Sequence, residues 1–89
     1  MLSNEVQVLS ELLISNDLTI SVAESCTGGS LSRALTSIPG ASSYFDCGYI
    51  TYSNQSKTEM LGVDIQTIKT FGAVSEEVAL EMVIGLATR

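Results

Sequence analysis

The sequence contains no histidine, no tryptophan and a single proline, and no apolar run approaches the roughly 20 residues that a membrane-spanning helix requires. The absence of histidine removes the usual base of Ser-His and Cys-His catalysis, together with the commonest metal ligand in proteins. A catalytic base must therefore be a lysine, a tyrosine or a carboxylate. Only two lysines are present, Lys57 and Lys69, so the candidates are few.

Positive charge and cysteine are also scarce. Four Lys and Arg against ten Asp and Glu give a net charge of −6, and no segment forms a basic cluster, so we expect no nucleic-acid partner. Cys26 and Cys47 have neither C-x-x-C spacing nor a zinc motif, and we expect them to be reduced thiols. No secretory signal is recognisable, so the expected location is cytoplasmic, without a membrane partner.

The composition is that of a globular protein, with 45% hydrophobic residues in a chain of 89, and we expect one domain over residues 1–89. Apolar periodicity and helix-stop residues predict helices over 4–15, 28–37, 54–61 and 75–89, with a short helical turn after Asp64. Alternating apolar residues and β-branched or aromatic residues predict strands over 18–24 and 43–53. Asn54 and Ser75 are the expected caps of their helices. Asp46 and Gly48 are expected to mark a bend or bulge.

This order of elements predicts the α/β class. We expect a small layered α/β domain, with a mostly parallel or mixed sheet of two to three strands and flanking helices. A sheet this small leaves an open edge, which we expect a second copy of the chain, another chain or further sequence to cover.

The turn between the first strand and the second helix is the first candidate site. It carries neighbouring polar residues and glycines, namely Glu24, Ser25, Cys26, Thr27, Gly28, Gly29 and Ser30. Unpaired N–H groups at the start of a helix can hold a phosphate or a developing oxyanion, and glycine lets a ligand approach the backbone. The alternative is an ordinary strand-to-helix turn capped by Ser25 or Thr27.

Ser25, Tyr52 and Lys57 form the first candidate catalytic group. A serine hydroxyl needs a base, and a lysine can serve when burial lowers its pKa. If the two predicted strands lie side by side, these residues meet at the carboxyl end of the sheet, where open α/β sheets bind ligands. The alternative is that Tyr52 is a half-buried strand aromatic and Lys57 a solvated helix residue.

The remaining polar residues of the turn have two interpretations each. Cys26 is a second candidate nucleophile, near a helix N-terminus, or else a small buried side chain. Thr27 and Ser30 fit capping or phosphate-binding hydroxyls. Glu24 could accept a hydrogen bond from a substrate or from a local backbone N–H.

Several motifs in order resemble one known family. They are Ala23-Glu24-Ser25-Cys26-Thr27-Gly28-Gly29, Ile38-Pro39-Gly40-Ala41-Ser42, Tyr52-Ser53-Asn54-x-x-Lys57, Leu61-Gly62-Val63 and Gly72-Ala73-Val74-Ser75-Glu76. Together they span nearly the whole chain and are similar to the CinA C-terminal domain family. Members of that family are longer, so the resemblance covers only part of a family domain.

The resemblance implies an amidohydrolase that removes the carboxamide nitrogen of nicotinamide mononucleotide as ammonia, leaving nicotinic acid mononucleotide. It implies Ser25 as the nucleophile, Lys57 and Tyr52 as the activating groups, and the neighbouring residues Glu24 and Cys26–Ser30 as the substrate-binding turn. It implies no metal and no organic cofactor. Two other functions fit the sequence: an inactive interaction module that self-associates through its last helix and open edge, and a nucleotide-binding domain without turnover.

Overall fold

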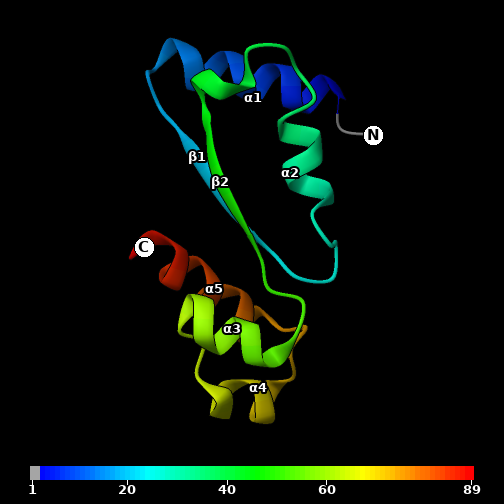
Figure 1. Cartoon of the computed structure of the whole chain (residues 1–89), viewed down its shortest axis with the longest axis vertical. Helices are drawn as coiled ribbons and strands as arrows, with labels where there is room; N and C mark the ends of the chain where they lie inside the picture. The colour runs from blue at the N-terminus through cyan, green and yellow to red at the C-terminus, as the bar shows by residue number, and fades with distance from the viewer. Residues whose placement is uncertain (1–2) are drawn as a thin grey trace.

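The computed structural model describes residues 3–89, and its elements follow the predicted order (Figure 1). Within these residues the helices and strands are α1 (Ser3–Ser15), β1 (Ile20–Glu24), α2 (Ser30–Leu35), β2 (Phe45–Ile50), α3 (Asn54–Leu61), α4 (Ile65–Phe71) and α5 (Glu76–Ala87), with a single 3₁₀ turn at Ala41–Ser43. None of the helices in the described part of the chain has both the length and the apolarity needed to cross a bilayer.

The sheet consists of β1 and β2 in parallel, which confirms the α/β class and the two-strand minimum of the prediction. Ile20 pairs with Phe45 and Val22 pairs with Gly48, so β2 carries one extra residue between these pairs. This irregularity confirms the bulge expected around Asp46 and Gly48. Both strands are shorter than predicted: β1 begins at Ile20 and not at residue 18, and β2 spans Phe45–Ile50 and not 43–53, because backbone groups beyond them bond elsewhere. The Leu18 N–H, for example, donates to the Leu13 carbonyl at the end of α1.

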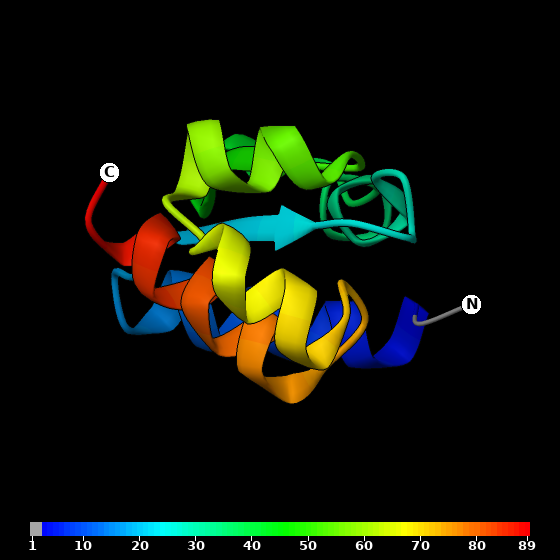
Figure 2. The same cartoon turned by 90° about the horizontal axis from the view of Figure 1, so that it is seen from below.

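Helices pack on both faces of the sheet, because successive strand residues point to opposite sides. Val22 packs with Val6 of α1 and Leu35 of α2. Its neighbour Ala23 packs against the other cluster, which gathers residues from α3 to α5: Leu61, Val63, Ile68, Val78 and Met82. Figure 1 shows α1 and α2 towards one end of the molecule and α3 to α5 towards the other, and Figure 2 shows the second group from below.

The helix starts were predicted with mixed success. The hydroxyl of Ser75 accepts from the Val78 N–H and the carboxylate of Asp64 accepts from the Gln66 N–H, as expected of caps. The expected cap Asn54 is wrong, because the hydroxyl of Ser53 accepts the bond from the Ser56 N–H. The helix predicted from residue 28 begins at Ser30, since Gly28 and Gly29 have φ of 63° and 109°, outside the helical region.

Gly85 lets α5 pack closely on α3, so a side chain at this position should destabilise the folded chain. A Cβ at this position would lie 1.8 Å from the Leu61 carbonyl oxygen. We expect Gly85→Ala to lower the free energy of unfolding by about 2 kcal/mol, because the forced helix separation outweighs the gain in helix propensity. Urea unfolding measures this. The reverse exchange at an exposed position of the same helix, Ala79→Gly, reports propensity alone. A Gly85→Ala chain as stable as the parent would contradict the packing.

Candidate active site

Lys57 is buried at the carboxyl end of the sheet. The chain leaves β2 at Ile50 and starts α3 at Asn54, which places Lys57 in the first turn of that helix. Its side chain is only 1% exposed, and its Nζ donates to the carbonyl oxygens of Thr51 at 2.7 Å and Tyr52 at 3.3 Å. The interpretation of Lys57 as a solvated residue is therefore wrong.

The same strand end carries Ser25. The Thr51 N–H donates to the Glu24 carbonyl at 2.9 Å, extending the pairing of β1 and β2 by one bond. Ser25 follows Glu24 directly, while the Thr51 carbonyl accepts the Lys57 ammonium. Ser25 and the Lys57 side chain, 32 residues apart in the sequence, thus both lie at the carboxyl end of the sheet, and within residues 3–89 no hydrogen bond joins them.

Burial changes the acid–base behaviour of Lys57. Removing the ammonium from water lowers the pKa of Lys57 below its usual 10.5, and the electrostatic interaction with Cys26 partly opposes this shift. No carboxylate is bonded to Nζ in the described chain, since its partners are backbone carbonyls. A larger fraction of neutral amine is therefore present near neutral pH than for a solvated lysine, which is what a general base needs.

Tyr52 lies outside this buried group. It follows the end of β2, and its side chain is 72% exposed, so the interpretation of Tyr52 as a half-buried strand aromatic is wrong. Its backbone carbonyl accepts from Lys57, but within residues 3–89 no hydrogen bond joins its hydroxyl to Ser25 or Lys57. The structure brings the backbone of Tyr52 to the site and leaves its ring at the surface.

Glu24 has a different environment from the one expected for a ligand-binding carboxylate. It is 4% exposed, and its two oxygens accept from the hydroxyls of Thr27 at 2.7 Å and Ser32 at 2.5 Å. They also accept from the backbone N–H groups of Leu31 at 2.7 Å and Ser32 at 2.8 Å. The carboxylate therefore caps α2 from the preceding strand, which confirms the alternative that Glu24 accepts from local backbone N–H groups. The alternative that Ser25 or Thr27 caps this helix is wrong.

The four hydrogen bonds decide the charge state of Glu24. Burial alone would raise its pKa, but the bonds from the Ser32 and Thr27 hydroxyls and from the Ser32 and Leu31 N–H groups outweigh burial and lower the pKa to about 2. Glu24 is thus a permanent anion near neutral pH. Its acceptor positions are filled from within the chain, so this side chain holds the turn together.

The turn after β1 is consequently less open to an anion than predicted. The Leu31 and Ser32 N–H groups donate to Glu24, and the Gly28 and Ser30 N–H groups donate back to the carbonyls of Ser25 and Thr27. In the described chain, this leaves the N–H groups of Ser25, Cys26, Thr27 and Gly29 without a protein acceptor. Any oxyanion donor in the turn must come from these four. Cys26 is a free, exposed thiol, so its interpretation as a small buried side chain is wrong.

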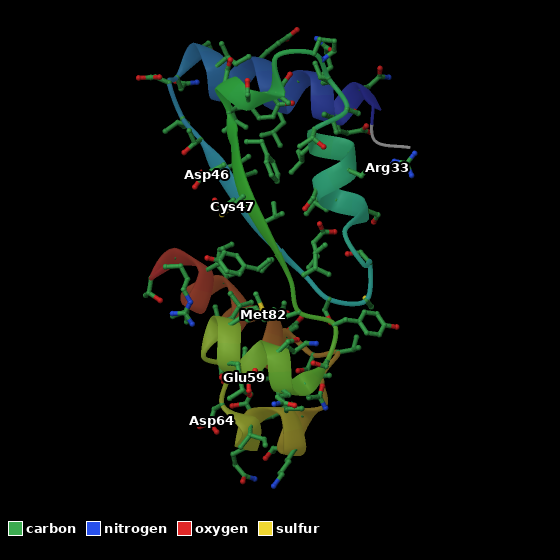
Figure 3. The ribbon with its side chains drawn as sticks, viewed as in Figure 1. Arg33, Asp46, Cys47, Glu59, Asp64 and Met82 are labelled. Carbon is green, nitrogen blue, oxygen red and sulfur yellow. The ribbon has the colours of Figure 1, made fainter. Side chains whose placement is uncertain are left out.

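A cavity of about 260 Å³ opens beside Ser25. One wall consists of the end of β1 and its turn, namely Ala23, Ser25 and Cys26. The opposite wall consists of α5 and the segment before it, namely Ala73, Val74, Ala79, Met82 and Val83. Figure 3 shows Met82 between the strands and α3. A larger hollow of about 370 Å³ runs along α1, but its lining, Asn4, Glu5, Val8, Leu9 and Leu12, holds no nucleophile.

Two parts of this site were not predicted from the sequence. The first is the pair of hydroxyl partners of Glu24, Thr27 and Ser32, for which their positions three and eight residues after it are a weak signal; only a backbone N–H partner was among the expectations. The second is the α5 wall of the cavity, where the small residues of Gly72-Ala73-Val74 before a serine cap were the available sign.

As for a metal, residues 3–89 contain no group of three or more cysteine, aspartate or glutamate side chains arranged to hold one.

Comparison with known proteins identifies the family. The model of the CinA C-terminal domain matches residues 3–89. The chain belongs to the CinA C-terminal domain family. A CinA-like protein of Chlorobium limicola is 52% identical over 83 residues, covering 93% of this chain and 19% of that protein. A CinA-like protein of Leptospira biflexa is 50% identical over 90 residues, covering 100% of this chain and 22% of that protein.

Solved CinA structures have the same fold. A competence-damaged protein (CinA) superfamily protein of Escherichia coli matches with a TM-score of 0.94 at 37% identity, covering 100% of this chain and 52% of that one. A competence/damage inducible protein of Agrobacterium tumefaciens matches with a TM-score of 0.84 at 44% identity, covering 94% of this chain and 53% of that one. The chain thus spans about half the length of these CinA structures and about a fifth of the curated CinA-like relatives.

Proposed function

We propose that this chain carries the nucleophile half of an amidohydrolase site that removes the carboxamide nitrogen of nicotinamide mononucleotide as ammonia. The observation that supports it is the buried Lys57 amine, held by the Thr51 and Tyr52 carbonyls at the strand end from which Ser25 emerges. Burial lowers the pKa of Lys57, and a lysine with a lowered pKa can activate a serine hydroxyl without histidine.

The proposed reaction has two stages. The neutral Lys57 amine takes the proton of the Ser25 hydroxyl as Oγ bonds to the carboxamide carbon. N–H groups of the turn, at Cys26, Thr27 and Gly29, are the donors for the oxyanion. Lys57 then returns the proton to the nitrogen as the C–N bond breaks, and ammonia leaves. Water attacks the resulting ester by the same proton route, which releases the carboxylate and restores Ser25.

The remaining residues have supporting roles in this proposal. Glu24 and Thr27 hold the turn through their mutual hydrogen bond. Ser30 is exposed and offers a hydroxyl to the nucleotide, and a Cβ on Gly28 would meet nothing within 4 Å, so a ligand can approach the backbone there. Tyr52 joins the reaction only if its exposed ring turns towards Ser25 when substrate binds. No metal or organic cofactor is required.

Ammonia release from nicotinamide mononucleotide by the purified chain tests this proposal. We expect turnover in the unaltered chain and in Cys26→Ala, because the thiol is not the nucleophile, and none in Ser25→Ala. Circular dichroism checks that each chain is folded. A folded, unaltered chain that releases no ammonia would rule out catalysis by this chain alone, and loss of activity in Cys26→Ala alone would assign the nucleophile to the thiol.

A second candidate function is self-association, which the exposed apolar side chains of α5 favour. Leu80, Val83 and Ile84 are 62%, 59% and 54% exposed, and each strand of the two-stranded sheet has one edge without a partner in the described chain. We propose that a second copy covers α5 and an open edge. Light scattering should then show a dimer that Leu80→Asp dissociates, whereas a monomeric parent chain would contradict it.

A further inference from the structure

Gly48 of β2 lies against the side chain of Ser32 on α2. It pairs with Val22 directly after the bulge, and a Cβ at this position would lie 2.7 Å from the Ser32 hydroxyl oxygen. The next atoms, Val22 Cγ2 at 3.3 Å and Phe45 Cζ at 3.7 Å, are farther away. A side chain on Gly48 would therefore displace mainly the Ser32 hydroxyl.

The Ser32 hydroxyl is one of the four donors to the Glu24 carboxylate. It donates to Oε2 at 2.5 Å, and the Ser32 N–H donates to the same oxygen at 2.8 Å. The other carboxylate oxygen accepts from Thr27 and Leu31. Ser32 is thus the residue that holds Oε2, and a rotation of its side chain would remove the shorter of the two bonds to this oxygen.

The backbone of Gly48 does not itself require glycine. A bulge that does require glycine places it in the left-handed region, whereas the φ of Gly48 is not positive, unlike those of Gly28 and Gly29 in the turn. Glycine inside a strand is also less favourable than alanine, because it loses more conformational freedom on folding. The close approach of the Ser32 hydroxyl accounts for a residue without a side chain at this position.

We infer that Gly48 is a positioning residue for Ser25: its missing side chain admits the Ser32 hydroxyl, which holds Glu24 and with it the turn that begins at Ser25. The inference rests on the proposed function, because Ser25 is taken as the nucleophile. It extends the site to the second strand, where a residue without a functional group sets the geometry of the nucleophile.

The pKa of the Glu24 carboxyl reports this contact without any turnover. In Gly48→Ala the new methyl group turns the Ser32 hydroxyl away, so the pKa of Glu24 should rise from about 2 towards its usual 4.5. An acid titration followed by ¹³C NMR of the carboxyl measures the rise. Ser32→Ala should raise the pKa similarly. Ser37→Ala is the control, because this exposed hydroxyl donates to the Ala34 carbonyl, and it should leave the pKa near 2.

A Glu24 pKa that stays at about 2 in Gly48→Ala would overturn the inference.

The double variant tests whether Gly48 acts through Ser32. Without the hydroxyl, the closest contact of the new methyl group is Val22 Cγ2 at 3.3 Å, so Gly48→Ala with Ser32→Ala should have the same Glu24 pKa as Ser32→Ala alone. The urea midpoint should fall when Gly48→Ala is made in the parent, and should not fall further when it is made in Ser32→Ala, since alanine is favoured over glycine in a strand. Additive losses would mean that the methyl group acts through Val22 or Phe45, and would overturn the inference.

Ammonia release from nicotinamide mononucleotide gives the functional readout. Because the turn carries the nucleophile and the oxyanion donors, we expect Gly48→Ala to lower kcat by about tenfold and to leave KM within about twofold of the parent. Ser37→Ala should release ammonia at the parent rate.

The two proposals fail separately. If the parent chain releases no ammonia while the Glu24 pKa rises in Gly48→Ala, catalysis by this chain is wrong and the positioning of the turn by Gly48 stands. If ammonia is released and Gly48→Ala releases it as fast as the parent, the proposed reaction stands and the role of Gly48 is wrong.

Discussion

Replacing Lys57 by methionine is expected to reduce ammonia release by about 10²–10⁴-fold, the usual contribution of a general base. Methionine keeps much of the buried length of the side chain but cannot accept the Ser25 proton. It also removes a charge that is costly to bury, since Lys57 is 1% exposed. The chain should therefore remain folded by circular dichroism while single-turnover assays show the loss.

The pH dependence separates a base from a purely structural lysine. Because burial lowers the pKa of Lys57, the rate in the parent chain should rise with pH as the amine loses its proton, and level off below pH 10.5. Lys57→Arg keeps a donor to the Thr51 and Tyr52 carbonyls but stays protonated, so it should not restore activity. Full activity in Lys57→Arg would show that Lys57 acts only by holding the strand end.

Replacing Glu24 by glutamine is expected to lower the free energy of unfolding near pH 7 by about 3 kcal/mol. The carboxylate accepts four hydrogen bonds from Thr27, Leu31 and Ser32. An amide has one acceptor oxygen, and its NH₂ group opposes the donors that remain. Urea unfolding at neutral pH measures the difference. Glu59→Gln is the control, because Glu59 is exposed on α3 and should change stability by no more than about 0.5 kcal/mol.

Acid should remove the same contribution from the parent chain. Folding lowers the pKa of Glu24 from its usual 4.5 to about 2, so the folded chain binds this proton more weakly than the unfolded chain. The stabilisation is therefore complete above pH 4.5 and is lost as the pH falls towards 2. In Glu24→Gln the unfolding free energy should depend less on pH across this window. If the unfolding free energy of Glu24→Gln falls in acid as much as that of the parent chain, carboxylates other than Glu24 cause the fall.

The location of the apolar and capping residues made much of the fold predictable. Val22 and Ala23 point to opposite faces because strand side chains alternate, and Ser75 and Asp64 mark helix starts through bonds to N–H groups two or three residues away. Such interactions are local, so their signals lie in short stretches of sequence. The cap of α2 was missed because its acceptor, Glu24, comes from the strand, seven and eight residues before the N–H groups it binds.

By itself, the sequence determined the order of helices and strands, the parallel pairing through a connecting helix, the exclusion of histidine chemistry and the family motifs around Ser25 and Lys57. Only the tertiary structure decided that Lys57 is buried with its amine on the carbonyls that follow β2, that Glu24 holds the turn instead of facing a ligand, that Tyr52 is exposed, and that α5 lines a cavity beside Ser25. The physical reason is that burial and hydrogen-bond partners depend on which distant segments meet. Residue type and spacing along one strand or helix do not specify these tertiary contacts.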